Sequence, residues 1–340
     1  MGLRQFKRTV RRSLGLIAPI TWRSKPKPSL LILTYHRVLP QGHPDRNIEQ
    51  PGMWVSPETL AMHLKVLSKY FEFADLFSWL VQSESGDTLP DRSCAITFDD
   101  GWRDNYTHAF PLLRQAGIPA TVFLVSEFIG GRYAFWPNRL ARLCRRLDTT
   151  DLSSLPAPLG AMIREMVSSE HKWAMPMTID QIDRLISACK TMPDAMLYEL
   201  IDEAERVTGI DSLVSQRDLL DVDEIAEMHQ SRLIRYGSHT KRHTRLLSGL
   251  SQNCLRDEVS GSKQQIEALL GQKVNLFCYP NGDYTEGAVD LVRRTYLGAV
   301  TTESGWNHLA TDRYRLRRMT LHEGISSDEQ SLLCRVAGLA

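Results

Sequence analysis

The sequence has no long hydrophobic run, no CxxC cysteine pair and almost no net charge. Its 340 residues include 41 Lys and Arg against 40 Asp and Glu, which leaves a formal charge of +1. This balance gives no global field that attracts nucleic acid, so we expect no nucleic-acid partner. No stretch reaches the ~20 apolar residues of a membrane-spanning helix. A hydrophobic content of 42% instead predicts a globular chain with one large core or two smaller cores.

Cysteine is scarce and scattered through the chain. Two of the six cysteines, Cys94 and Cys278, lie inside apolar runs, where a thiol packs as a small hydrophobic group. This distribution predicts a reducing compartment. The apolar stretch 14–20 is too short for a secretory signal and has no small-residue cleavage site, so the sequence predicts a cytoplasmic protein.

Acidic residues are absent from the start of the chain, where the first one is Asp45. Segment 1–29 is basic and has apolar residues between its cations, a pattern typical of a helix that lies on an anionic membrane surface. A frayed, solvated terminus has the same composition, so peripheral membrane contact and a free terminus are both open. The cations that precede Asp45 are Arg4, Lys7, Arg8, Arg11, Arg12, Arg23, Lys25, Lys27 and Arg37.

Short β-branched and aromatic runs recur along the chain with room for a helix between them, which is typical of parallel strands joined by crossovers. Helix starts are marked by Ser56-Pro57-Glu58, a cap followed by an N1 proline, and by the capping-box residues Asp221 and Glu224. Seven or eight strands predict an α/β fold closed into a barrel. The expected strands are 30–36, 71–76, 93–98, 120–125, 233–237, 275–279, 297–302 and 314–322.

The middle of the chain differs, because from about residue 128 to 232 it contains no convincing strand. Helical patterns cover 138–147, 178–190 and 193–207. We interpret this stretch as a helical insertion rather than an independent domain, since predicted barrel strands flank it closely. The expected organisation is a basic segment at 1–29, a barrel at 30–325 with the insertion at about 128–232, and a C-terminal helix at 326–340.

Two adjacent carboxylates end the predicted strand 93–98. Asp99 and Asp100 repel each other when both are ionised, so a fold that places them at a strand end commonly has a cation or a reaction for them. Neighbouring strand residues point to opposite faces, and a turn at Gly101 would aim both side chains into one cavity. A solvated Asp-Gly turn has the same sequence, so the segment alone fits both interpretations.

Two histidines follow the predicted strand 233–237. His239 and His243 are four residues apart, which places them on one face of a helical turn and lets both imidazoles reach one ion. Loops after barrel strands are where barrel enzymes build their sites. Two histidines and one aspartate would form a ligand set with open positions, as catalytic zinc and iron sites require.

Two further strand ends carry polar or turn residues. His36 ends the first predicted strand, although a lone histidine is more often a structural donor than a catalyst. Segment 277–282, Phe-Cys-Tyr-Pro-Asn-Gly, ends a later strand, and its simplest interpretation is a tight loop.

Taken in order, a strand that ends in TFDDG, then HTxxH, then FxYPxG, resembles the polysaccharide deacetylase family, also called carbohydrate esterase family four or the NodB homology domain. The resemblance runs from about residue 30 to 322 and finds no motif in the insertion. It implies a distorted (β/α) barrel with a divalent metal at the carboxyl ends of its strands. Asp99 would be the general base, and Asp100, His239 and His243 would be the metal ligands. Zinc is the favoured metal, and cobalt, manganese and nickel fit the same ligand set.

The family's general acid is a histidine, and two positions in this chain are similar to it. His36 lies in a YH motif on the opening strand, as in members whose barrel is permuted. His322 lies on a late strand, where the unpermuted order places the acid. We favour His36, with His322 as the competitor.

The family's RxPY motif is altered here, because Cys278 occupies the position of its arginine and Asn281 that of its tyrosine. Bracing of the base must then come from elsewhere, and we expect Arg318, on the last predicted strand, to supply it. The resemblance further implies that the backbone amide of Asn281 receives the oxyanion, with Tyr279 beside the substrate.

The activity that the resemblance implies is metal-dependent hydrolysis of N-acetyl groups from an amino sugar in an envelope polysaccharide, an oligosaccharide or a glycolipid precursor. One alternative keeps the site and removes a formyl or other acyl group from a lipid-linked amino sugar at the inner leaflet, which the basic segment would suit. Another is an inactive carbohydrate-binding barrel. The missing motif arginine favours that second alternative, and the retained carboxylates and histidines count against it.

Overall fold

The computed structural model describes residues 3–132, 134–168, 175–212 and 217–339. The chain forms two compact units. The first comprises 1–41, 52–131 and 219–340, and the second comprises 42–51 and 132–218. None of the described helices is long and apolar enough to span a bilayer.

The first unit is built on a nine-stranded sheet with the order β10-β1-β5-β6-β7-β8-β9, in which β11 also pairs with β1 and β4 with β5. The described pairs are parallel except β1 with β10. A separate pair joins β2 (Arg37–Val38) and β3 (Trp54–Val55). The strands of the large sheet are β1 (Ser29–Tyr35), β4 (Glu72–Phe73), β5 (Arg92–Phe98), β6 (Ala120–Leu124), β7 (Ile234–Ser238), β8 (Leu276–Cys278), β9 (Gly298–Val300), β10 (Asn307–His308) and β11 (Met319–Thr320).

An irregular segment closes the sheet into a distorted barrel. Leu316 bridges Val300 of β9, and Met319 pairs with Leu33 of β1, so the chain between them links the two sides of the sheet. Regular strand geometry in this segment is confined to β11, which is shorter than the strand expected at 314–322. The structure thus confirms the predicted α/β barrel class.

Both faces of the strands are covered, as the apolar runs predict. Along β1, Leu31 and Leu33 belong to the main core, whereas Leu30 and Ile32 pack in a second cluster that also contains Phe123. This alternation follows from the two-residue period of a strand. The second cluster draws on five strands and on α3, so it fills the interior of the barrel.

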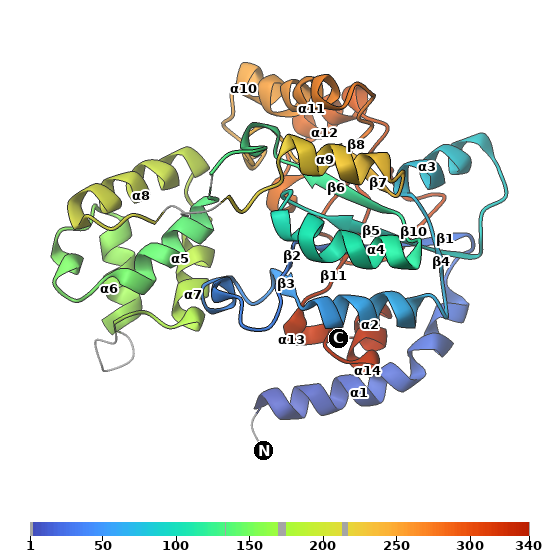
Figure 1. The fold of residues 1–340 in the computed structure, drawn as a ribbon, viewed down its shortest axis with the longest axis horizontal. Coiled ribbons are helices and arrows are strands. Elements are labelled where there is room, and N and C mark those ends of the chain that lie inside the picture. Colours follow the sequence, from blue (N-terminus) through green and yellow to red (C-terminus); the bar gives the residue numbers. More distant parts are fainter. Residues whose placement is uncertain (1–2, 133, 169–174, 213–216, 340) are drawn as a thin grey trace. The chain divides into compact units, whose positions relative to one another are not determined.

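Helices alternate with the strands and lie along the sheet (Figure 1). The predicted caps are confirmed, since the Ser56 hydroxyl accepts from Thr59 N and Asp221 forms a capping box with Glu224. The helices of this unit are α1 (Leu3–Thr21), α2 (Pro57–Leu67), α3 (Leu76–Ser85), α4 (Phe110–Ala116), α9 (Val222–Gln230), α10 (Gln252–Arg256), α11 (Ser262–Leu270), α12 (Glu286–Thr295), α13 (Glu323–Ser326) and α14 (Glu329–Val336).

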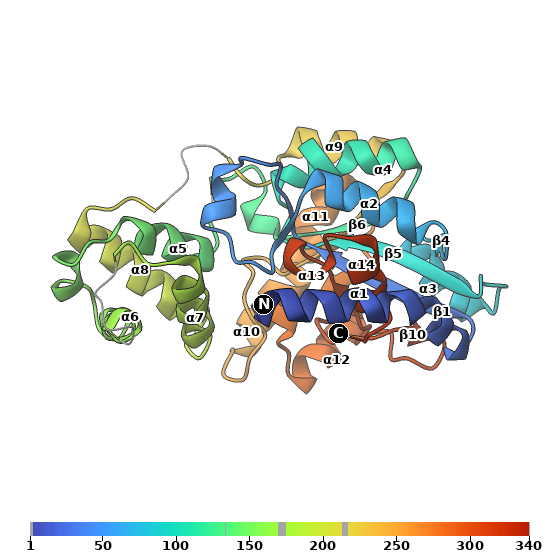
Figure 2. The ribbon, with the colours of Figure 1, turned by 90° about the horizontal axis from the view of Figure 1, so that it is seen from below.

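The N-terminal helix is attached to the barrel unit. Helix α1 lies beside α14 in both views of the ribbon (Figures 1 and 2). A Cβ atom at Gly15 would stand 2.0 Å from the backbone oxygen of Gln330, so the two helices approach each other closely at that point. Trp22, at the end of α1, is 1% exposed and packs against Phe71 and Trp306.

The second unit is helical and has a core of its own. Its helices are α5 (Trp136–Arg146), α6 (Leu159–Ser168), α7 (Ile179–Cys189) and α8 (Asp194–Thr208). The loop 42–51 joins it through Glu49, which accepts from Asn138, and through Gln50, which donates to Asp183. Helix α9, inside the stretch read as an insertion, belongs to the barrel unit instead.

Candidate functional site

The two carboxylates, Asp99 and Asp100, follow strand β5 directly. The amide of Asp99 still donates to Tyr35 O on β1, at 3.0 Å. Asp100 and Gly101 then both adopt left-handed backbone, with φ of 73° and 75°. The chain therefore turns one residue earlier than the Gly101 turn that the sequence suggests. Left-handed backbone at a non-glycine residue costs about 1 kcal/mol or more, and such strain gathers at functional sites.

Asp99 is held by Arg318. Two guanidinium nitrogens donate to its two carboxylate oxygens, each at 2.8 Å, and Arg318 Nε donates to Thr301 O at 2.8 Å. The guanidinium is fully buried and Asp99 is 2% exposed. Burial alone would raise the pKa of Asp99, but the charge and hydrogen bonds of Arg318 outweigh it and lower that pKa. Asp99 is therefore an ionised carboxylate with a fixed orientation.

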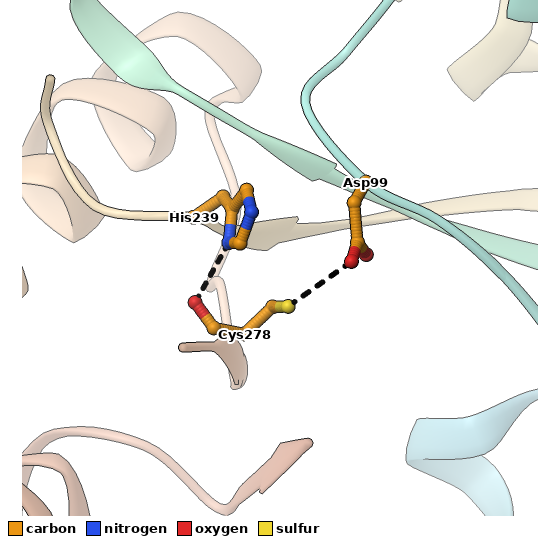
Figure 3. Close-up of side chains that lie close together, drawn as sticks. All are labelled: Asp99, His239 and Cys278. Atoms are coloured by element: carbon orange, nitrogen blue, oxygen red, sulfur yellow. Dashed lines mark hydrogen bonds between the residues drawn. The ribbon is translucent and has the colours of Figure 1, made fainter. Parts of the chain in front are cut away.

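Cys278 completes the surroundings of Asp99. Its sulfur lies 3.5 Å from Asp99 Oδ2, and its carbonyl accepts from His239 Nδ1 at 2.8 Å (Figure 3). The sulfur also lies 3.2 Å from Arg318 Nη2. Burial raises the pKa of the Cys278 thiol. Because the thiol stays protonated and Asp99 is taken up by Arg318, Asp99, His239 and Cys278 form a poor metal site, although their polar atoms lie within 4.8 Å of one another.

Asp100, His239 and His243 also gather within 4.8 Å. Asp100 Oδ1 lies 3.5 Å from His239 Nε2 and 3.4 Å from His243 Nε2. The other oxygen, Oδ2, accepts from Trp102 Nε1 at 2.9 Å. Burial opposes ionisation of Asp100, but the two imidazoles outweigh it and hold its pKa below the usual range. The predicted helical turn between the histidines is wrong, because residues 239–243 form a loop.

The histidine loop is shaped by left-handed residues and by a buried acid. Thr240 and His243 have φ of 65° and 60°. Glu258 is fully buried, and its Oε2 accepts from the backbone amides of Lys241 at 2.9 Å and of Arg242 at 3.0 Å. The left-handed residues interrupt helical geometry, and the two hydrogen bonds to one carboxylate oxygen hold the loop in this shape.

The second donor group fits a divalent cation. His239 Nδ1 donates to the Cys278 carbonyl, which leaves Nε2 facing Asp100 Oδ1. Burial lowers the pKa of His239, but the neighbouring Cys278 and Asp100 outweigh it and raise that pKa, so a proton occupies the space between Nε2 and Oδ1. A divalent cation would take the place of that proton. Two ligands bound to zinc at ~2.0–2.1 Å with tetrahedral angles stand ~3.4 Å apart, which matches the 3.4 and 3.5 Å found here. The orienting hydrogen bonds on His239 and Asp100 are typical of metal centres.

The two candidate acids have different surroundings. His36 Nε2 lies 3.8 Å from Asp99 Oδ2, and its side chain is 19% exposed, so it borders the carboxylates and is open to solvent. Burial lowers the pKa of His322 to about 4, and the nearby charges of Arg335 and Arg11 act in the same direction. The geometry therefore favours His36 over His322.

The loop after β8 carries the two residues expected at the substrate. Asn281 is exposed and has left-handed backbone, with φ of 56°. Tyr279 is fully buried, and its hydroxyl donates to Tyr314 O at 3.1 Å. A direct contact between the Tyr279 side chain and substrate does not fit this position, because the ring packs beneath the loop.

The sequence interpretation did not include Trp102 or Glu258. Trp102 follows the Asp-Asp-Gly turn directly, and a buried aromatic donor next to a carboxylate pair is a signal that could have found it. Glu258 lies 15 residues beyond His243, inside a helical stretch, and nothing in its local sequence marks it as a partner of the histidine loop.

Comparisons with known proteins give matches in sequence and in fold. A family model described as polysaccharide deacetylase matches residues 86–175 and 200–300, more than half of the chain. YxkH of Bacillus subtilis (strain 168), whose name assigns it to the polysaccharide deacetylases, is 35% identical over 60 residues. That match spans 17% of this chain and 22% of the length of YxkH.

Solved structures share the fold. The deacetylase PplD of Streptococcus pyogenes, in complex with acetate, gives a TM-score of 0.56 at 17% identity, over 88% of this chain and 96% of that chain. IcaB from Ammonifex degensii gives a TM-score of 0.56 at 17% identity, over 90% of this chain and 97% of that chain.

Proposed function

Because this chain belongs to the polysaccharide deacetylase family, we propose that it is a metal-dependent carbohydrate N-deacetylase that hydrolyses the acetamide of an amino sugar. The observation that carries the proposal is the pairing of two carboxylates with different surroundings. Asp100 lies close to the imidazole nitrogens of His239 and His243. Both carboxylate oxygens of Asp99 instead accept hydrogen bonds from Arg318. Adjacent acids in contrasting environments take different roles in catalysis.

Asp100, His239 and His243 would hold the cation, and zinc suits a set with two nitrogens and one oxygen, with cobalt, manganese and nickel as further candidates. When bound there, a divalent cation supplies Lewis-acid activation of water and of the acetyl carbonyl. Trp102 keeps Oδ2 of Asp100 occupied, which leaves Oδ1 for the metal. His239 is oriented by the Cys278 carbonyl through its Nδ1.

Asp99 would act as the general base and take a proton from the attacking water. Arg318 holds this carboxylate ionised and fixes its plane. His36, 3.8 Å from Asp99, would give a proton to the departing amine, since an amine anion is a very poor leaving group. The backbone amide of Asn281, in the loop after β8, would donate to the oxyanion.

The test is acetate release from N-acetylglucosamine oligomers, with metal content measured on the same protein. We expect activity that a chelator abolishes and that zinc or cobalt restores. Asp99→Asn should lower kcat by about 10²–10⁴-fold and retain the metal. His239→Ala should lose both the activity and the bound metal, whereas the control His229→Ala, on α9, should keep both. Full activity in the chelated protein, or in Asp99→Asn, would contradict the proposal.

A second candidate keeps the site and changes the substrate to a lipid-linked amino sugar that carries an acetyl, formyl or other acyl group. The observation that favours it is the basic helix α1, which lies on the barrel unit that contains the site. A panel that compares soluble oligomers with lipid-linked amino sugars separates the two candidates by kcat/KM. A non-catalytic barrel is disfavoured, because Arg318 contacts Asp99 and would take the part of the arginine that the family has where this chain has Cys278.

A further inference from the structure

The outward face of helix α1 is unusually apolar. Its exposed large hydrophobic residues are Val10 at 40%, Leu16 at 71%, Ile17 at 47% and Ile20 at 63% exposure. These are four of the nine exposed large hydrophobic side chains among the residues whose burial the structure describes. Such residues are common one at a time, but a cluster on one helix marks a surface that binds something.

The opposite face of α1 holds the helix in place. Gly15 and Ala18 are buried, and Trp22 anchors the end of the helix. Arg12 Nε donates to Asp328 Oδ2 at 3.2 Å. The alternative of a frayed terminus does not fit a helix with these contacts. The apolar face is therefore presented by a fixed element of the barrel unit.

The orientation of α1 follows from the same contacts. Arg12 meets Asp328, which caps the start of α14, and Gly15 meets Gln330 one turn further along. Trp22 meets Trp306, which donates to Val336 O at the end of α14. The two helices thus run side by side in the same direction. Because α13 and α14 follow the carboxyl end of β11, α1 begins at that edge of the sheet, which is the edge that carries the site.

The positive charge of the N-terminal segment indicates what kind of surface the apolar face of α1 binds. The chain has no acidic residue before Asp45, and α1 with the segment that follows it carries Arg4, Lys7, Arg8, Arg11, Arg12, Arg23, Lys25 and Lys27. An exposed apolar face on a segment whose only charged residues are cations is complementary to an anionic bilayer, which offers hydrocarbon below a layer of negative headgroups. A second copy of this chain would instead bring two equally basic segments together, and their repulsion opposes such pairing.

We propose that the outer face of α1 docks this protein on the surface of an anionic lipid bilayer, with Leu16, Ile17 and Ile20 inserted at the headgroup boundary. The helix lies in the plane of the surface and does not cross it, in keeping with its length and charge. The inference does not depend on the proposed activity, since binding is measured without a substrate.

The experiment is co-sedimentation of the full chain with vesicles of phosphatidylcholine mixed with phosphatidylglycerol, and with vesicles of phosphatidylcholine alone. We expect binding to the anionic vesicles that added NaCl weakens. The double variant Leu16→Ser/Ile20→Ser should bind at least tenfold more weakly. The matched control is Leu309→Ser, because Leu309 is 58% exposed and lies in the turn after β10, outside α1. Circular dichroism confirms that each variant is folded.

Three results would overturn the proposal. The first is equal binding to the two kinds of vesicle, and the second is equal binding by the double variant and its parent. The third is a parent protein that is dimeric by analytical ultracentrifugation, does not bind vesicles, and becomes monomeric in the double variant. That result would identify the face as a contact between two copies of the chain.

Discussion

At the scale of single residues, the contact between Arg318 and Asp99 decides whether the base is ready to accept a proton. Arg318 lies on the segment that closes the barrel, whereas the family's arginine position, at the end of β8, is Cys278 in this chain. The charge of Arg318, which directly precedes β11, reaches the carboxylate that follows β5 because the barrel brings these parts of the chain together.

Arg318→Lys should therefore lower kcat by about tenfold to a thousandfold, because a lysine keeps the charge but loses the two-point contact. The pKa of Asp99 should rise when the contact weakens, so the acid limb of the pH profile of kcat/KM should move to higher pH. The bound metal should be retained. The neighbouring Arg317→Lys serves as the control, since Arg317 is half exposed and pairs only loosely with Glu303, at 3.9 Å. An unchanged pH profile in Arg318→Lys would rule out the bracing role.

Glu258 holds the histidine loop by direct hydrogen bonds, although it lies 15 residues beyond His243 in the sequence. Its Oε2 accepts from two loop amides, whereas the hydrogen bonds of the adjacent Asp257 within the described part of the chain come from the side chains of Lys241 and Arg242. Glu258→Gln removes the charge and should weaken zinc binding by about 10–100-fold, the usual effect of losing a residue that orients ligands. A chelator competition measures this affinity directly. Asp257→Asn is the control and should change it little, and equal affinities in the two variants would contradict the role of Glu258.

The sequence placed the residues of the candidate site in one region because they end successive strands of a parallel sheet. It could not give the details that depend on side chains far apart in the chain. The helical turn expected for His239 and His243 failed for this reason, since Thr240 and His243 have left-handed backbone and the loop is held by hydrogen bonds to Glu258. The buried position of Tyr279 depends likewise on a hydrogen bond to the distant Tyr314.

At the scale of elements, a buried histidine joins three of them. His63 on α2 has its Nδ1 3.0 Å from the Tyr35 hydroxyl on β1 and its Nε2 2.7 Å from Ser326 O on α13. The carbonyl accepts a hydrogen bond from Nε2–H, so in the neutral ring Nδ1 accepts one from the tyrosine hydroxyl. Burial lowers the pKa of His63 to about 4. The contact thus fixes the end of β1, directly before His36.

This contact predicts a loss of stability in acid. The unfolded state has a histidine pKa near ~6.5 and binds the proton first, so the free energy of unfolding should fall as the pH drops from ~6.5 to ~4, by roughly 3 kcal/mol. Urea titrations at several pH values measure the decrease. His63→Gln should lose this part of the dependence, whereas His322, whose pKa is also lowered to about 4, should retain its own part. The same slope in His63→Gln as in the parent protein would contradict the argument.

At the scale of the whole molecule, long strands and capped helices follow from the sequence, and the closure of the barrel does not. Strands β1 and β5 each bury a long apolar run, so their positions are encoded locally. Strands β2, β3 and β10 have two residues each, too few for any period to show. The segment around Leu316 bridges β9 with little regular structure, because its hydrogen bonds go to residues that the fold alone brings near.

Metal binding should be visible as stability of the whole barrel unit, because the candidate ligands come from loops after two different strands. Asp100 follows β5, whereas His239 and His243 follow β7, and the bound ion would tie the loops together. Zinc at about a hundred times its Kd should add ~2.7 kcal/mol, which raises Tm by about 5 °C or more in a unit of this size. Differential scanning calorimetry with zinc and with chelator measures the shift. Asp99→Asn should keep the shift while losing activity, and His243→Ala should lose both. A shift that persists in His243→Ala would mean that zinc binds elsewhere on the chain.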